Sequence, residues 1–412
     1  MDGKPAAAVA TEVSGPPSPG VSRVRLADGI EELVRFTLAA SSGESWDDCD
    51  VLLSRDYCFR LLQDEPNPTD PHLNDLGNVC GGVPVYPLYK HLARAIEQCI
   101  NSGIFPRPTN FVGSILLDES LKMRENEWSK LILDEGSELL KMFNAVEFEL
   151  HVQEPFFSQL RAGLKTVEGR CATGDYNRIT PGSLLLFNTC LLLEVQDVRG
   201  YSSFSEMLQV ETLARVLPGV KTIEEVFSGV KIYRKFYTEE KEKSNGVLAI
   251  AVSKVASQPY ISVANLLSGL SYDGVGSLLG MTHTVGTVPD ALPPPRSFLI
   301  SSSMNPHRPN VKGCSLTDAA RALAKHVNRS SDGWWGDFNG SDSKKNMRAL
   351  EVINRLLINC CWMNVHLIQP YDCVFEIRVR EGYGARWSKY GSKFIGFLEP
   401  YTEEGFAKGW KH

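Results

Sequence analysis

The octapeptide GLKTVEGR, residues 163–170, brings two cations and a carboxylate together within six positions. Lys165 can offer its ammonium group to a phosphate, and Arg170 can grip a phosphate at two points or stack on a base. Glu168 lies between them and can hold both cations in place or accept a hydrogen bond from a base amine. Gly163 lets the backbone turn without a steric penalty. The octapeptide therefore predicts an anion-binding loop, with a solvated salt-bridge cluster on a turn as the alternative.

Two further groups of residues combine aromatic rings with cations, an arrangement that is common in proteins that bind single-stranded RNA. The first group comprises Tyr233, Arg234 and Lys235, for which the alternative is a rim helix with solvated charges. The second group, flanked by glycines in the C-terminal part of the chain, comprises Trp334, Trp335, Arg386 and Trp387. The alternative for these tryptophans is that they anchor the core of a small domain.

The elements that must position these residues predict an α+β multidomain protein. Residues 26–149 repeat apolar positions at helical spacing, which predicts an N-terminal helical domain that follows a disordered tail, 1–25. Residues 150–255 alternate short apolar strands with a few helices, which predicts a small β-barrel. Residues 256–296 show low apolar periodicity and end in VPDALPPPRS, so we expect a proline-rich linker. Residues 297–412 run from two helices into antiparallel strands, which predicts a compact α+β domain.

The helical pattern is clearest in the N-terminal domain. One predicted helix places four apolar residues on a single face, namely Ile30, Leu33, Val34 and Leu38. A second predicted helix, in YPLYKHLARAIEQCINSG, ends at Gly103, which predicts a glycine C-cap. We expect these helices to form a bundle whose acidic outer face is solvated.

Charge is distributed unevenly along the 412 residues, although the net charge is only −6. Residues 1–149 hold 13 basic and 24 acidic residues, whereas residues 296–412 hold 17 basic and 11 acidic residues. A basic C-terminal part is compatible with a polyanionic partner. The excess of six basic residues is modest and does not by itself identify a ligand, and we expect protein partners through the acidic helical domain.

Several function classes are disfavoured by the sequence. The first residues contain Asp2 and Glu12 and lack an unbroken apolar core, which argues against a secretory signal. No apolar run approaches the ~18 residues that are needed to span a bilayer. The ten cysteines form no C-x-x-C pair, the histidines are scattered, and GVGSLLG lacks the G-x-G-x-x-G spacing. We expect buried free thiols, no metal, no cofactor and no membrane contact, in a protein of the nucleus or cytoplasm that is not secreted.

The octapeptide fits the G-x-K-x-x-E-x-R pattern of the ASCH domain, a branch of the PUA-like superfamily. The resemblance extends over residues 148–255, because PGSLLLFN is similar to the family's G-D-x-I-x-F strand, with Ser183 where Asp is common. VKIYRKFYTEE and GVLAIAVSK resemble its late tyrosine-bearing segment and its closing strand, and the whole chain is similar to plant-type proteins that contain this domain. The resemblance implies a small β-barrel with a cleft beside the octapeptide. It also implies RNA, or more broadly a nucleic acid or nucleotide, as the ligand.

Catalysis by this domain is the main alternative to binding alone. Family members that are amidohydrolases of acylated pyrimidine nucleosides use a lysine, a threonine three residues later and a downstream glutamate. Lys165 matches the lysine, but Glu168 stands where the threonine would be. No glutamate stands at 217–218, where the family pattern places it, and Glu211, Glu224 and Glu225 nearby match no motif. We therefore predict a binding protein that acts in transcription or RNA processing. The alternatives are a nucleoside amidohydrolase or nuclease that uses Lys165, and a scaffold or transcription-coactivator-type protein that acts through its acidic helices.

Overall fold

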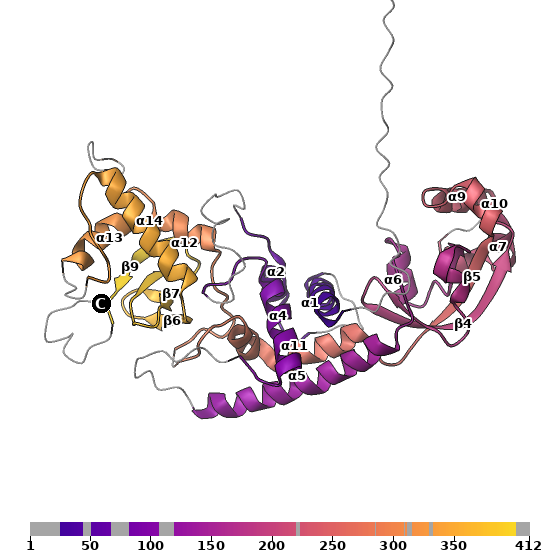
Figure 1. The fold of residues 1–412 in the computed structure, drawn as a ribbon, viewed down its shortest axis with the longest axis horizontal. Coiled ribbons are helices and arrows are strands. Elements are labelled where there is room, and N and C mark those ends of the chain that lie inside the picture. The colour runs from indigo at the N-terminus through magenta and orange to yellow at the C-terminus, as the bar shows by residue number, and fades with distance from the viewer. Residues whose placement is uncertain are drawn as a thin grey trace, which may run out of the picture. The chain divides into compact units, whose positions relative to one another are not determined.

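The computed structural model of the chain describes residues 25–43, 51–66, 82–106, 119–219, 223–284, 286–308, 310, 315–328 and 333–400. The fold is mixed α/β and divides into two compact units (Figure 1). The middle unit comprises residues 1–29 and 139–259, and the composite unit comprises residues 30–138 and 260–412. The sequence predicts separate N-terminal and C-terminal domains, whereas most residues of both lie in the composite unit.

The middle unit is built on a curled five-stranded sheet with the strand order β1-β3-β4-β5-β2. Its strands are β1 (Phe148–Leu150), β2 (Val167–Cys171), β3 (Leu184–Phe187), β4 (Leu191–Tyr201) and β5 (Val247–Lys254). β1 and β3 are parallel, and the other neighbouring pairs are antiparallel. β1 and β2 lie at the two edges, so these strands form a half-barrel where the sequence predicts a small barrel.

Short helices lie between the strands along the chain, as the sequence predicts for residues 150–255. They are α6 (Phe156–Arg161), α7 (Phe204–Val210), α8 (Leu213–Val216), α9 (Ile223–Arg234) and α10 (Glu239–Asn245). Ser203 caps α7 by accepting a hydrogen bond from the backbone N–H of Glu206. Phe204 and Met207 of this helix then pack against Val167 of β2 in the core of the unit.

The composite unit contains most of the helices. They are α1 (Leu26–Ser42), α2 (Arg55–Leu62), α4 (Leu88–Ser102), α5 (Glu119–Ala145), α11 (Pro259–Leu278), α12 (Arg296–Ser303), α13 (Asp318–Val327) and α14 (Asp342–Ile358). The four apolar residues predicted to share one face of α1 are all buried. Gly103 ends α4 with a φ of 70°, and its N–H donates to the carbonyl of Cys99, as its position in the sequence predicts.

The expected linker at residues 256–296 is largely structured. Its first half is α11, whose residues Tyr260, Leu266, Leu267 and Leu270 are buried. Residues 282–284 and 286–288 lie along the edge of β6 (Trp362–Ile368), because backbone hydrogen bonds join Thr282 to Met363 and Val288 to Val365. Ser271 has a φ of 55° and breaks α11 into two helical parts. The apolar residues on either side of this break therefore do not follow one continuous helical period.

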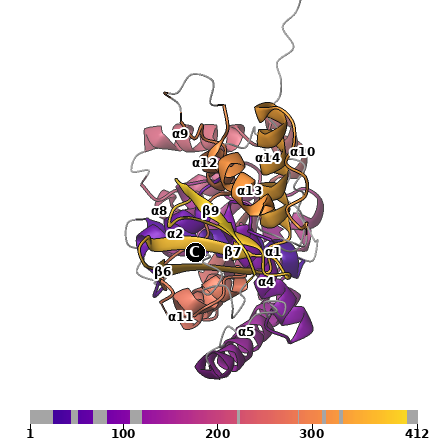
Figure 2. The ribbon, with the colours of Figure 1, turned by 90° about the vertical axis from the view of Figure 1, so that its left-hand side faces the viewer.

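A four-stranded antiparallel sheet completes the composite unit, with the order β6-β7-β8-β9. Its other strands are β7 (Asp372–Arg378), β8 (Gly384–Ser388) and β9 (Phe394–Leu398). α12, α13 and α14 lie on one side of this sheet (Figure 2), and Phe375 and Trp387 fill the core between them. The helix-then-strand order that the sequence predicts for the C-terminal part is therefore observed.

The described cysteines carry free thiols, and Cys58, Cys99, Cys171, Cys190 and Cys360 are buried. Burial raises the pKa of the Cys99 and Cys171 thiols to about 11 and that of Cys360 to about 12. These thiols are therefore protonated and unreactive at neutral pH. Within the described ranges, no helix combines the length and apolar character that a membrane span requires.

Candidate nucleic-acid interface

The second half of the octapeptide is not a loop, because residues Val167–Cys171 form β2 and pair with β5. The Lys165 side chain is only 2% exposed. Its Nζ donates hydrogen bonds to the carbonyl of Val167 at 2.7 Å and to that of Val216 at 2.6 Å, and it lies 3.2 Å from Glu168 Oε2. An ammonium group has three hydrogens to donate, so these three acceptors saturate it.

Arg170 completes a buried ion network with Glu168. Its Nε lies 2.9 Å from Glu168 Oε1, and its Nη2 donates to the carbonyl of His151 at 2.7 Å. The side chains of Glu168 and Arg170 are 8% and 11% exposed. Burial lowers the pKa of Lys165 below its ordinary value, and Glu168 opposes that effect. Neither alternative from the sequence describes this network, which is neither a solvated cluster nor an accessible loop.

Gly163 lies in the turn before this network. A Cβ at this position would meet no atom within 4 Å, so space does not require glycine here. The φ of +71° does favour it, because other residues rarely adopt this backbone conformation. Its N–H donates to the carbonyl of Leu160 and closes the turn after α6. The predicted turn is therefore present.

Tyr233, Arg234 and Lys235 are separated by their surroundings. The Tyr233 ring is buried and stacks on Phe204, with the ring centroids 4.2 Å apart. Arg234 forms an ion pair with the buried carboxylate of Glu242, and only Lys235 is exposed. A base cannot stack on Tyr233 unless Phe204 moves, so this ring does not contribute to an interface in the observed fold.

A group of exposed cations that the sequence analysis missed lies next to the octapeptide. Glu211 is buried, and its Oε2 lies 3.0 Å from Arg199 Nη2 and 3.8 Å from Arg215 Nη1. Its Oε1 accepts a hydrogen bond from Tyr201. The two arginine side chains are 40% and 46% exposed, and Arg215 Nε donates to Thr166 Oγ1 at 3.2 Å. Arg199 Nε also lies 3.1 Å from the exposed carboxylate of Asp197, so two carboxylates face the two guanidinium groups. Both guanidinium groups remain half-exposed, and a phosphate that displaced Asp197 could bind to them.

The sequence contains no local signal for this arginine pair. Arg199 comes from the end of β4 and Arg215 from α8, and only the fold brings them to the same carboxylate.

Trp335 and Trp387 are core residues. The Trp387 ring is fully buried, and its Nε1 donates to the carbonyl of Leu299 and to Ser303 Oγ, both at 3.0 Å. The Trp335 ring is also buried, and its Nε1 donates to Glu399 Oε1 at 2.9 Å. Both tryptophans therefore anchor the core, as the alternative interpretation predicts, and neither ring is available to stack on a base.

Trp334 is partly exposed, but its ring faces are occupied. The Tyr383 ring stacks on it, with the centroids 4.2 Å apart and the planes 10° apart. The guanidinium carbon of Arg355 lies 3.9 Å from the Trp334 ring centroid, a close cation–π contact. A base would have to displace one of these groups.

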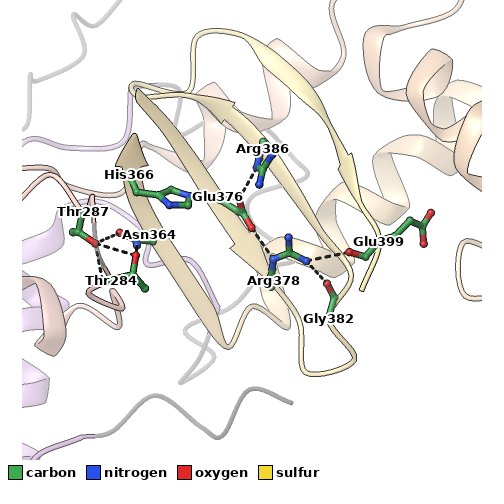
Figure 3. Close-up of polar contacts among 9 residues, drawn as sticks. All are labelled: Thr284, Thr287, Asn364, His366, Glu376, Arg378, Gly382, Arg386 and Glu399. Carbon is green, nitrogen blue, oxygen red and sulfur yellow. Dashed lines mark hydrogen bonds and ion pairs between the residues drawn. The ribbon is translucent and has the colours of Figure 1, made fainter. Parts of the chain in front are cut away.

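Arg386 belongs to a polar cluster on the C-terminal sheet (Figure 3). Its Nε donates to Glu376 Oε2 at 2.5 Å, and Arg378 Nε donates to Glu376 Oε1 at 2.6 Å. His366 Nε2 lies 3.4 Å from Glu376 Oε2. Burial would raise the pKa of Glu376, but His366 and the two arginines more than offset it and hold the pKa at about 2. We call these four residues the Glu376 cluster.

Two neighbouring sets of hydrogen bonds fix the Glu376 cluster in the sheet. Arg378 Nη1 donates to the carbonyls of Gly382 and Glu399, at 2.7 and 3.2 Å. Asn364, beside Glu376 in the strand register, donates to Thr284 Oγ1 and accepts from Thr287 Oγ1. The sequence signal for this cluster was the alternation of charged residues at 376 and 378 after the apolar residues 373–375 of the strand. In the part of the chain that the structure describes, no group of three or more His, Cys, Asp or Glu side chains could hold a metal ion.

Comparison with known proteins yields two family matches. The ASCH domain family matches residues 150–256, and the family described as the CdiA C-terminal tRNase toxin domain matches residues 306–399. A search among curated proteins gave no significant match.

Two solved structures are similar to a quarter of the chain. The crystal structure of the hypothetical protein PH0355 is 42% identical and covers 26% of this chain and 97% of its own, with a TM-score of 0.25. The solution structure of protein PF0455 from Pyrococcus furiosus is 41% identical with the same coverage and a TM-score of 0.24.

Proposed function

Because residues 150–256 are an ASCH domain, we propose that this protein binds RNA through its middle unit. The family as a whole is associated with RNA binding. The observation that supports a specific surface is the pair of half-exposed arginines, Arg199 and Arg215, beside the octapeptide. Phosphate contacts by arginine supply affinity without sequence preference.

In this proposal the octapeptide supports the surface and does not contact the RNA. Lys165 binds the carbonyl of Val216, and the N–H of Thr166 donates to the carbonyl of Arg215 at 3.0 Å. Both bonds hold the α8 segment against β2, and they fix the backbone from which the Arg215 side chain projects. Gly163, Lys165, Glu168 and Arg170 are then positioning residues. This role also accounts for the saturated ammonium of Lys165, which an amidohydrolase would need as a reacting group.

Binding of a single-stranded RNA, followed by fluorescence anisotropy at several salt concentrations, tests this surface. Arg199→Ala/Arg215→Ala should weaken binding at least tenfold. The slope of log K against log salt should fall by about 1.4, at about 0.7 for each phosphate that the variant no longer neutralises. Arg178→Ala is the matched control, because this arginine is 65% exposed in the same unit and pairs only with exposed Asp175 among the described residues. Equal affinities for the double variant and the control would reject this surface.

RNA cleavage by the C-terminal part is a second candidate function. It is supported by the match of residues 306–399 to a tRNase toxin domain family, and this range contains the whole Glu376 cluster. A chain that binds RNA in one unit and cleaves it in the other would serve in RNA processing. We favour that role over transcriptional coactivation or scaffolding by the acidic helices. The expected nuclear or cytoplasmic location stays a prediction.

The second function is tested by incubating the full chain with bulk tRNA and with an unmodified single-stranded RNA. Defined fragments that accumulate with time are the expected result. Intact RNA in both reactions would remove the second function and leave RNA binding by the middle unit unaffected.

A further inference from the structure

We propose that RNA is cleaved at the Glu376 cluster, with His366 as the catalytic proton-transfer residue and Arg386 as the group that binds the scissile phosphate. This inference rests on the second function proposed above. It assigns that function to named atoms on one face of the C-terminal sheet.

The strand register places the cluster on a single face. Asn364, Glu376 and Arg386 are direct neighbours across β6, β7 and β8. Side chains alternate along a strand, so Phe375 and Trp387 point to the opposite face. That opposite face packs against the helices as the hydrophobic core. The cluster therefore lies on the face opposite the core that packs against α12, α13 and α14. Its side chains are largely buried, with Glu376 3%, Arg386 12% and His366 15% exposed, so RNA would reach it at the partly exposed edges of Arg386 and His366.

The balance of charge in the cluster favours an anionic ligand. Two arginines share one carboxylate, so one positive charge remains uncompensated within the cluster. Arg378 uses its Nη1 to bind two backbone carbonyls, which makes it a fixed part of the structure. Arg386 pairs only through Nε, and its terminal nitrogens have no hydrogen-bond partner among the described residues. A phosphate fits this pattern, because a guanidinium group can bind it with those remaining donors.

Base-binding side chains are present at the same end of the sheet. His366 pairs with Val374 near the β6–β7 turn, which carries Tyr371. Tyr371 and Tyr390 are 45% and 63% exposed, and Lys389 Nζ lies 5.3 Å from the Tyr390 ring centroid. Exposed rings beside a cation are typical of surfaces that stack unpaired bases. They favour RNA over a small phosphate compound as the ligand.

The geometry allows a cleavage step that uses the RNA's own 2′-hydroxyl. The buried Nε2 of His366 faces Glu376 Oε2 at 3.4 Å, which leaves the other ring nitrogen to take the proton of the 2′-hydroxyl. The 2′-oxygen then forms a bond to phosphorus, and the bond from phosphorus to the 5′-oxygen breaks. Arg386 stabilises the charge that develops on the phosphate oxygens. The proton passes from His366 through solvent to the leaving 5′-oxygen, so the products are a 2′,3′-cyclic phosphate and a 5′-hydroxyl.

Glu376 acts through its neighbours and is a positioning residue. Its carboxylate orients the imidazole of His366 and the guanidinium of Arg386 at the same time. Glu376→Gln would keep the shape but remove the charge that aligns both cationic groups. A folded Glu376→Gln variant should therefore lower kcat for cleavage at least tenfold and leave KM for RNA nearly unchanged, a split that a purely structural role would not produce.

The test compares full-length wild type, His366→Gln, Arg386→Ala and Arg380→Ala on bulk tRNA and on a 5′-labelled single-stranded RNA. Arg380→Ala is the matched control, because Arg380 is an exposed arginine just after β7 and is not part of the Glu376 cluster. Wild type and control should produce 2′,3′-cyclic phosphate ends, and a 2′-deoxy nucleotide at the cleaved position should block the reaction. His366→Gln should slow cleavage at least 100-fold, in line with removal of a general base. Circular dichroism shows whether each variant is folded.

The outcomes separate the two proposals. If wild type cleaves RNA and folded His366→Gln cleaves at the same rate, the assignment to this cluster is wrong and the cleavage function stands. If cleavage yields 3′-hydroxyl ends or proceeds on the 2′-deoxy substrate, the proposed step is wrong. If wild type cleaves neither RNA, both the second function and this inference fail. RNA binding that depends on Arg199 and Arg215 would survive all three outcomes.

Discussion

Glu168→Gln should destabilise the middle unit strongly, because Glu168 is the carboxylate that neutralises two buried cations. Lys165 Nζ and Arg170 Nε lie 3.2 and 2.9 Å from its oxygens, and the two cationic side chains are 2% and 11% exposed. The amide of Gln keeps the shape but leaves both positive charges in a poorly solvated place. Breaking a buried ion pair in this way costs about 3–5 kcal/mol. We expect a loss of about 4 kcal/mol, since backbone carbonyls still accept from both cations.

Amide hydrogen exchange of the full chain measures this loss of stability in the middle unit separately from the composite unit. The amides of β2 and β5 form the ladder beside the network, so their slow exchange reports the opening of this sheet. At about 1.4 kcal/mol for each factor of ten, a loss of about 4 kcal/mol accelerates their exchange by about 10³-fold. Peptides from α13 and α14, in the composite unit, serve as an internal reference.

Glu239→Gln is the matched control, because it makes the same chemical change at a side chain that is 63% exposed in the same unit. Its exposed ion pairs contribute about 1 kcal/mol or less, so exchange should accelerate about fivefold at most. If Glu168→Gln accelerated exchange no more than Glu239→Gln, the buried network would not hold this sheet together. The positioning role of the octapeptide would then lose its basis.

Three other predictions follow from buried groups. The pKa of Glu376 is about 2, below its ordinary value of 4.5. Its charged form therefore stabilises the composite unit above pH 4.5 by about 3 kcal/mol, at about 1.4 kcal/mol per pH unit, and this is lost as the pH falls toward 2. Acid unfolding of wild type and Glu376→Gln checks this, and parallel curves would refute it. Trp387→Ala should cost the composite unit about 3–5 kcal/mol in thermal or urea unfolding and leave RNA binding by the middle unit unchanged. N4-acetylcytidine should release no acetate, because the Lys165 ammonium is saturated by three acceptors; release that Lys165→Ala abolishes would show the opposite.

Periodicity predicted the elements that bury one continuous apolar face. The face of α1 and the end of α4 at Gly103 were confirmed because a buried stripe and a left-handed glycine each leave a local sequence pattern. α11 was missed because glycines and serines interrupt its apolar pattern and Ser271 breaks the helix. The half-barrel was predicted as a barrel because the number of strands does not determine whether a sheet closes.

The site residues were predicted less well, because burial cannot be read from residue type. Lys165, Arg170 and Tyr233 have side chains that suit RNA, yet the fold places them in a network or a core. Arg199 and Arg215 had no motif to mark them, and they meet only at the carboxylate of Glu211. Arg386 was predicted for its charge and glycine context, but its pairing with Glu376 depended on the strand register.

Crosslinking of a 4-thiouridine RNA to the full chain, with mapping of the crosslinked peptides, tests the central claim of RNA binding most directly. We expect crosslinks in residues 196–218, which carry Arg199 and Arg215, and their loss in Arg199→Ala/Arg215→Ala but not in Arg178→Ala. Crosslinks confined to the N-terminal helices α1, α2 and α4, or unchanged in the double variant, would contradict it.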